Sequence, residues 1–315
     1  MPKVFVAGHR GLIGSALVRQ LQASGRWEVV TSDRAETDLT DARAVEKLLS
    51  RHQPEWVVVA AGRVGGILAN SRFPAQFIYE NLMIEANLIH GTWRAGVKRL
   101  LNFGSGCMYP RVCPQPMSTE RLMSAPVEPT SAPYAVAKWA GMVMCQSYNQ
   151  QHGTDYRTVI PCTVYGPGDC FDLERAHVVS ALLRRFHEAH QREDAEITLW
   201  GSGKPRREFI FVEDVAGACL FLMEREGASY PLNIGTGVSH SIWELAEETA
   251  RIVGFRGRIR WDESQPDGAP EKVLDSAPLH RLGWIPATDL HAGLEMTYRW
   301  FQKQQMAKER VCVSS

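Results

Sequence analysis

The segment Tyr134-Ala-Val-Ala-Lys138 carries the two side chains best suited to proton transfer. A tyrosine and a lysine four residues apart on a helix share one face. A lysine ammonium beside a phenol favours the phenolate and lowers its pKa, so that the tyrosine can act as an acid or base near neutral pH. Pro133 suits a first helical turn and places the pair near a helix start. The spacing predicts a catalytic pair; an ordinary amphipathic helix is the alternative.

A second set of reactive side chains lies in Gly104-Ser-Gly-Cys-Met-Tyr-Pro110, directly after the predicted strand Arg99–Phe103. Ligands of open α/β sheets bind beyond the carboxyl ends of the strands. At such a position Ser105 could bond a substrate oxygen and Cys107 could carry a proton. A turn of small residues with an inert, packed cysteine is the alternative.

Cationic residues gather in the second half of the chain. They are His177, Arg184 and Arg185 on the predicted helix His177–His190, Arg206 and Arg207 in the turn Trp200–Arg207, and Lys272. Arginine binds phosphate in bidentate fashion, so this set could hold a diphosphate. A solvated helix face and a basic loop would show the same composition.

Glycines mark a second ligand site near the N-terminus. Gly8, Gly11 and Gly14 follow the short apolar run Val4–Ala7 and precede an amphipathic helix. The first glycine permits a tight turn, the second lets the backbone approach a pyrophosphate, and the third lets the helix pack closely on the strand. The helix N-terminus then faces the phosphates. The spacing differs from the standard G-x-G-x-x-G, but the context predicts a dinucleotide site.

The choice between NAD and NADP depends on three charged residues. Asp33 follows the second predicted strand, Trp27–Thr31, where an acid would bond a ribose 2′-hydroxyl and favour NAD. Arg34 and Arg10 could instead bind a 2′-phosphate, and these two arginines favour NADP. We expect Asp38 and Leu39 to lie near the adenine, with a plain polar loop as the alternative.

Strand-like and helix-like segments alternate through the first half of the chain, which predicts an α/β fold: a Rossmann-like, doubly wound parallel sheet. The expected strands include Trp56–Ala61 and Tyr156–Val164, and the long helices Ala75–Ala95 and Pro133–Gln151. We expect residues 1–165 to form the dinucleotide-binding domain, with returning segments near 208–235. Residues 166–207 and 236–315 are expected to form a smaller C-terminal substrate-binding domain.

The bulk composition narrows the function class. The 315 residues include 35 basic and 35 acidic side chains, and this balance argues against a nucleic-acid partner. No apolar run reaches transmembrane length, so no membrane association is expected. The seven cysteines are odd in number and none forms a C-x-x-C pair, which argues against a disulfide framework or a zinc site and favours a cytoplasmic protein.

Together these residues resemble the extended short-chain dehydrogenase/reductases that act on nucleotide sugars, in particular those that epimerise and reduce GDP-4-keto-6-deoxy sugars. The resemblance runs from about Lys3 to about Phe301. The motifs that carry it are VAGHRGLIGSAL, AAGRVGGILAN, GSGCMYP, EPTSAPYAVAKWAG, VYGPGD, HVVSALLRRFHEA, WGSGKPRREF, NIGTGV and PDGAPEK.

The resemblance implies specific roles. Ser105, Tyr134 and Lys138 would form the reductase triad, and Cys107 and His177 the acid/base pair for 3,5-epimerisation. Contacts to the GDP part would come from Arg185, Trp200, Arg207 and Lys272. The cofactor, NADPH with NAD possible because of Asp33, would be bound by Gly8, Arg10, Gly11, Leu12, Ile13, Gly14, Asp33, Arg34, Asp38, Leu39, Ala60, Ala61, Lys138, Pro161, Val164 and His177. A homodimer through the two long helices is implied as well.

Two departures leave the sugar open. Position 106 is glycine where the family commonly has a second serine, and Thr163 stands where it usually has asparagine. An enzyme that only epimerises or only reduces a related nucleotide 4-keto sugar, such as a GDP-4-keto-heptose or a 3,6-dideoxy sugar, is therefore an alternative. A non-catalytic dinucleotide-binding regulator is a further alternative, against which the retained Tyr134 and Lys138 argue.

Overall fold

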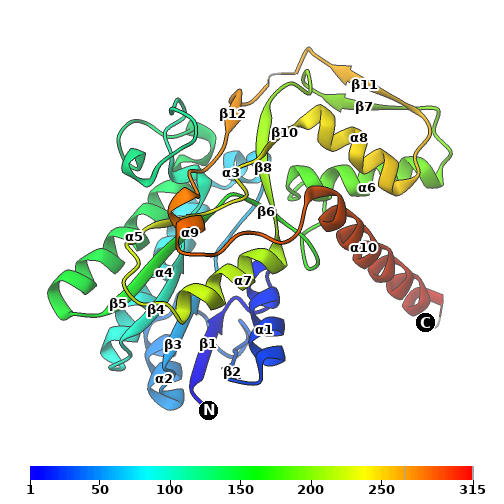
Figure 1. The fold of residues 1–315 in the computed structure, drawn as a ribbon. Helices are drawn as coiled ribbons and strands as arrows, with labels where there is room; N and C mark the ends of the chain where they lie inside the picture. The colour runs from blue at the N-terminus through cyan, green and yellow to red at the C-terminus, as the bar shows by residue number, and fades with distance from the viewer. Residues whose placement is uncertain (266, 314–315) are drawn as a thin grey trace.

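The main sheet consists of parallel strands in the order β2-β1-β3-β4-β5-β9 in the computed structural model, which describes residues 1–265 and 267–313 (Figure 1). Its strands are β1 (Lys3–Ala7), β2 (Glu28–Val30), β3 (Trp56–Val59), β4 (Arg99–Phe103), β5 (Asp155–Pro161) and β9 (Leu232–Ile234). The strand order reverses beside β1, and ligands of open α/β sheets bind at such a switch point.

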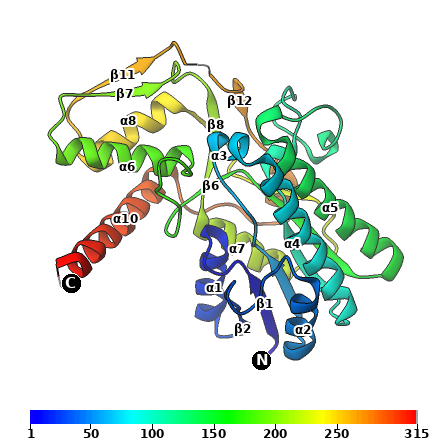
Figure 2. The same cartoon turned by 180° about the vertical axis from the view of Figure 1, so that it is seen from behind.

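Helices cover both faces of this sheet (Figures 1 and 2). They are α1 (Leu12–Ser24) and α7 (Val212–Met223) on one face, and α2 (Ala42–His52), α4 (Pro74–Arg94) and α5 (Ala132–His152) on the other. Successive side chains of β1 point to opposite faces of the sheet, and both faces are apolar. Val4 and Val6 pack with α1 and α7, whereas Phe5 and Ala7 pack with α2 and α4. Strands buried on both faces read as continuous apolar runs.

A smaller lobe lies beyond the carboxyl ends of these strands (Figure 1). Its mixed sheet contains β6 (Thr163–Tyr165), β8 (Arg206–Phe211), β10 (Ser239–Ser241) and β12 (Glu271–Lys272), and a parallel pair joins β7 (Glu196–Trp200) to β11 (Arg258–Asp262). Helices α6 (Val178–Gln191), α8 (Ile242–Val253) and α10 (Leu290–Val313) share a second apolar core with these strands. Short helices are α3 (Ile67–Arg72), α9 (Ala277–Arg281) and the 3-10 turns η1 (Gly106–Met108), η2 (Thr119–Arg121) and η3 (Pro129–Ser131).

The predicted single strand Tyr156–Val164 is wrong in one respect. The chain leaves the main sheet after Pro161 and enters the second sheet at Thr163, so that one apolar run supplies both β5 and β6. Of the segments near 208–235, β9 pairs with β5 and α7 packs on α1, while β8 pairs with β6, β10 and β12 of the second sheet. The sequence pattern did not predict α7, because most residues of this helix are apolar and no polar face alternates with an apolar one.

Candidate active site

The turn η1 brings Ser105 and Cys107 against helix α5. Ser105 caps η1, and its Oγ accepts a hydrogen bond of 3.3 Å from the Cys107 amide. The Trp139 indole on α5 donates to the Met108 carbonyl at 2.9 Å and fastens the turn to the helix. Ser105 is hydrogen-bonded to the side chain of Tyr134, and Cys107 interacts with the same phenol electrostatically. Three of the residues selected from the sequence therefore meet at the carboxyl end of β4.

Tyr134 and Lys138 lie on one face of α5, as their spacing predicts. The Lys138 Nζ is 5.9 Å from the centre of the Tyr134 ring. Burial raises the pKa of Tyr134, and Lys138 lowers it by less, so the net shift is upward. The expectation of a lowered phenol pKa is thus wrong in sign, because the sequence pattern shows the lysine but not the desolvation. A phenol held in its protonated form suits a proton donor.

Lys138 has a partner that the sequence analysis missed. Its Nζ lies 2.6 Å from the Oε1 of Glu85 on α4, and both side chains are almost fully buried. Burial raises the pKa of Glu85; for Lys138 burial works downward, but the Glu85 carboxylate and Tyr134 raise its pKa overall. The sequence does hold a signal for this partner: Glu85 lies on the apolar face of its helix, four residues after the buried Asn81.

The glycine turn has the geometry that a pyrophosphate requires. Gly8 has a φ of +83°, and a Cβ there would lie 2.6 Å from the Ala61 amide nitrogen. A Cβ on Gly14 would lie 2.1 Å from the Gly8 carbonyl oxygen. Gly11 is the N-cap of α1 and has no capping side chain, so the first amides of the helix, at Leu12 and Ile13, point toward the turn. These residues fit a dinucleotide cofactor.

Asp33 contacts two residues of the glycine turn. Asp33 accepts a hydrogen bond of 2.6 Å from Arg10, and its other oxygen lies 3.3 Å from His9 Nε2. Arg34 is exposed and acts electrostatically on Asp38.

Both residues that were expected near the adenine, Asp38 and Leu39, make hydrogen bonds within the protein. The carboxylate of Asp38 accepts hydrogen bonds from the amide and hydroxyl of Thr40, at 2.9 and 2.8 Å, and these bonds lower the pKa of Asp38. The Leu39 carbonyl accepts from Asn87 at 3.0 Å, and its side chain packs on the core beside α2.

The remaining expected cofactor residues come from the ends of two strands of the main sheet and from β6. Ala60 and Ala61 follow β3, Pro161 ends β5, and Val164 belongs to β6. The loop after β6 returns to α1, where a Cβ on Gly168 would lie 3.0 Å from the Ser15 hydroxyl.

His177 lies in the smaller lobe, at the start of α6. It is the N-cap of α6 and half-buried, and the residues just before it meet the loop after β3, where the Gly66 amide donates to the Arg175 carbonyl at 3.3 Å. His177 interacts electrostatically with the carboxylate of Asp169, which also accepts hydrogen bonds from Ser180 and from the Cys170 amide. Asp169 is a second residue that the sequence analysis missed.

The four residues expected to hold the nucleotide come from four elements of the smaller lobe: α6, β7, β8 and β12. Arg185 on α6 donates to the Thr198 carbonyl on β7, the strand that ends at the exposed Trp200. Arg207 on β8 and Lys272 on β12 occupy paired positions in neighbouring strands. Arg184 and Arg206 point elsewhere: Arg184 pairs with Glu188 at 2.7 Å, and Arg206 donates to Ser239. Of the basic residues grouped in the sequence analysis, Arg184 and Arg206 are therefore separated by their contacts from Arg185, Arg207 and Lys272.

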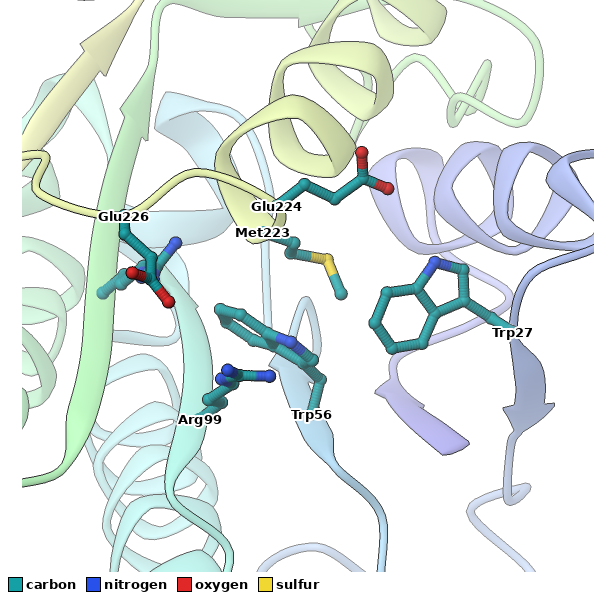
Figure 3. Close-up of a pocket in the computed structure, with 7 residues that line it drawn as sticks. Trp27, Trp56, Arg99, Met223, Glu224 and Glu226 are labelled. Carbon is teal, nitrogen blue, oxygen red and sulfur yellow. The ribbon is translucent and has the colours of Figure 1, made fainter. Parts of the chain in front are cut away.

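A hollow of about 260 Å³ lies at the opposite, amino-terminal end of the main sheet (Figure 3). Trp27, Trp56 and Met223 line it together with two arginines and two glutamates. Its cations are already engaged: Arg99 pairs with Glu55 at 2.6 Å and Arg157 with Asp155 at 2.5 Å. This hollow is remote from the strand ends where α/β folds bind ligands.

Among the side chains that the structure describes, which leave out those of residues 67–68, 266 and 307–315, no group of three or more His, Cys, Asp or Glu is arranged to hold a metal ion. No helix of the described part of the chain is long and apolar enough to cross a membrane.

The chain belongs to the NAD dependent epimerase/dehydratase family, whose family model matches residues 4–235. It is 46% identical over 312 residues to GDP-L-fucose synthase of Escherichia coli (strain K12), covering 96% of this chain and 97% of that one. Among solved structures, a GDP-6-OMe-4-keto-L-xylo-heptose reductase from C. jejuni superimposes with a TM-score of 0.89 at 34% identity, covering 96% and 98%. A GDP-L-fucose synthetase from Naegleria fowleri bound to NADP gives 0.90 at 25% identity, covering 97% and 95%.

Proposed function

We propose that this protein catalyses the NADPH-dependent 3,5-epimerisation and 4-keto reduction of a GDP-4-keto-6-deoxy sugar and forms GDP-L-fucose. The observation that carries the proposal is the meeting of Ser105, Cys107 and Tyr134 at the end of β4. A reductase alone requires the tyrosine; the adjacent thiol adds a group for proton transfer at carbon. The identity to GDP-L-fucose synthase over nearly the whole chain supports the same reaction.

Reduction depends on the Tyr134 phenol. Ser105 and Tyr134 hydrogen-bond the C4 oxygen, and bound NADPH supplies the hydride to C4. Tyr134 then gives its proton to the oxygen; its raised pKa keeps the phenol protonated until that step. Lys138 holds the nicotinamide ribose and keeps a positive charge near the phenol that loses its proton.

Epimerisation uses the acidity that the C4 ketone confers on C3 and C5. Cys107 and His177 act as the acid/base pair: one removes a proton, and the other returns one to the opposite face. The bonds from Ser105 and Tyr134 to the C4 oxygen stabilise the enolate between the two steps. Asp169 interacts electrostatically with His177 and accepts hydrogen bonds from Ser180 and from the Cys170 amide, so it is held beside the histidine.

The two lobes divide the ligands between them. The main sheet and the helices that cover it form the dinucleotide domain, whose glycine turn holds the cofactor pyrophosphate. The smaller lobe, which includes β6 and β8, forms the nucleotide-sugar domain. There Arg207 and Lys272 contact the diphosphate, and Arg185 and Trp200 contact the remainder of the GDP.

The first test is turnover. The purified protein is incubated with GDP-4-keto-6-deoxy-D-mannose and NADPH, with NADH in parallel; cofactor absorbance is followed and the product is identified by NMR. We expect oxidation of NADPH with formation of GDP-L-fucose. Oxidation with a product epimerised at neither C3 nor C5 would leave a reductase only, and no turnover with either cofactor would reject this substrate.

A second candidate is the reduction of a related GDP-4-keto sugar, either a heptose or a 3,6-dideoxy sugar, and Gly106 favours the heptose. A Cβ at that position would meet no atom within 4 Å, so there is room beside Ser105 and Cys107 for a larger substituent. Thr163, at the start of β6, also lies near this end of the sheet. Parallel assays with a GDP-4-keto-heptose distinguish the two candidates, and a Gly106→Ser variant should shift the ratio toward the 6-deoxy sugar.

We also propose that the protein is a cytoplasmic homodimer. The long helices α4 and α5 expose apolar side chains at Tyr79, Val136 and Val143, which pairing with a second copy would cover. The thiols that the structure describes are free, in keeping with a reducing compartment. Light scattering of the purified protein tests the dimer, with a single-chain mass as the contrary result.

A further inference from the structure

One face of α4 contacts the active site at three points. Phe77, Asn81 and Glu85 follow one another at four-residue intervals and share this face. The Phe77 ring meets the Tyr134 ring edge-on, with centroids 6.5 Å apart. Asn81 bonds to the backbone of the loop after β3, and Glu85 lies 2.6 Å from Lys138.

The Glu85 carboxylate is deeply enclosed. Its side chain is 2% exposed and that of Lys138 is 5% exposed. Two buried charges of opposite sign depend on each other, because removal of one leaves the other uncompensated in a medium of low polarity. Helix α5 makes room for the carboxylate at Gly141, where a Cβ would lie 1.3 Å from Glu85 Oε2. The pair is therefore built into the packing of the two helices.

We propose that Glu85 is a positioning residue of the reductase: its buried carboxylate anchors the Lys138 ammonium and sets the net charge next to Tyr134. The proposal rests on the reductase function proposed above. It extends that function by giving the catalytic lysine a fixed counter-ion inside the fold.

The charge balance at Tyr134 follows from the groups that face it. Lys138 from α5 lowers the pKa of the phenol, while Glu85 from α4 and Cys107 from η1 raise it, and Cys145 on α5 lies near Glu85. Loss of the Glu85 carboxylate has one of two consequences. If Lys138 stays charged, the pKa of the phenol falls; if it does not, the pKa of the buried Lys138 itself falls. Reduction needs both protons, so either event moves the alkaline limit of reduction in the same direction.

The pH profile of reduction tests this. For Glu85→Gln we expect the alkaline fall of kcat/KM with NADPH and the 4-keto sugar to move about one pH unit lower. Glu85→Asp keeps the charge and should keep the position of the fall, even if turnover is slower. Glu46→Gln, which breaks an exposed ion pair between α2 and α4, is the matched control and should leave the profile unchanged. A Glu85→Gln profile that is lower in amplitude but unmoved would overturn the proposal.

A thermal-unfolding cycle tests the pair without substrate. We expect Glu85→Gln and Lys138→Met each to lower Tm by several degrees, and the double variant to lose clearly less than the sum, because neither charge is then left alone. Additive losses would overturn the proposal. Wild-type protein that gives no turnover but shows the coupled cycle would reject the proposed function and retain the Glu85–Lys138 pair.

Discussion

The Arg10 guanidinium, in the glycine turn, donates a hydrogen bond of 2.6 Å to the Asp33 carboxylate beyond β2. The acid that would select NAD is thus paired with a cation that could bind a 2′-phosphate. We expect Arg10→Met to weaken NADPH binding about tenfold and to leave NADH binding nearly unchanged, because one charge-assisted bond to the 2′-phosphate is lost. Fluorescence titration with both cofactors measures this. Equal losses for the two cofactors would mean that Arg10 does not read the 2′-phosphate.

Separate removal of Cys107 and His177 should divide the proposed reaction. We expect Cys107→Ser and His177→Gln each to slow solvent-deuterium exchange at C3 and C5 by about 10²–10⁴-fold, because each variant loses one proton-transfer group. NMR of the recovered sugar shows at which carbon exchange has slowed more in each variant, and so at which carbon each residue acts. Tyr134→Phe is the matched comparison: it should stop reduction and leave exchange measurable. Exchange at the wild-type rate in the Cys107 variant would remove the thiol from the mechanism.

Gly141→Ala should be far more harmful than an alanine in a helix normally is. A Cβ there would collide with the Glu85 carboxylate, so the variant must move that side chain or separate α4 from α5. Overpacking of this kind costs about 1–3 kcal/mol, against a small gain expected from helix propensity alone. Urea unfolding measures the difference, with Ala140→Gly as a control for propensity. A stabilised Gly141→Ala protein would show that the two helices are not closely packed at this point.

The start of α8 predicts a pH-dependent contribution to stability. Ser241 Oγ accepts from the Glu244 amide at 3.0 Å, and Glu244 accepts from the Ser241 amide at 2.7 Å. The backbone hydrogen bond from Ser241 lowers the pKa of Glu244 below its usual value. A folded-state pKa below the unfolded one stabilises the fold above the unfolded pKa, and this stabilisation is lost as pH falls through the folded pKa.

Glu244→Gln should therefore lower Tm at neutral pH, and the difference from wild type should shrink as pH falls below about 4. Thermal unfolding across pH measures the effect. Glu247→Gln, an exposed change on the same helix, serves as the control. A Glu244→Gln deficit that is constant down to pH 3 would exclude the capping carboxylate as its cause.

Local sterics explain why the glycine turn and the Tyr134–Lys138 face were predictable. Gly8 has a positive φ, and Gly14 lies too close to a carbonyl for a side chain. The glycines in the sequence therefore indicate the backbone conformation directly. The Tyr134–Lys138 spacing likewise places both side chains on one helix face whatever the rest of the chain does.

Contacts between distant segments were not predictable in this way. The Lys138–Glu85 pair arises from the packing of α4 on α5, and the sign of the Tyr134 pKa shift depends on burial that no local pattern reports. The break between β5 and β6 was missed because the apolar run continues through Cys162 while the chain changes sheets.

The passage of the chain from one sheet to the other at Cys162 also affects how the protein unfolds. One residue separates the two strands, and the chain crosses between the lobes again from β8 to α7 and from β9 to β10. A protease that cuts one crossing still leaves the halves joined through the others. We therefore expect the protein to unfold as one cooperative unit, in which unfolding of the smaller lobe destabilises the lobe built on the main sheet as well.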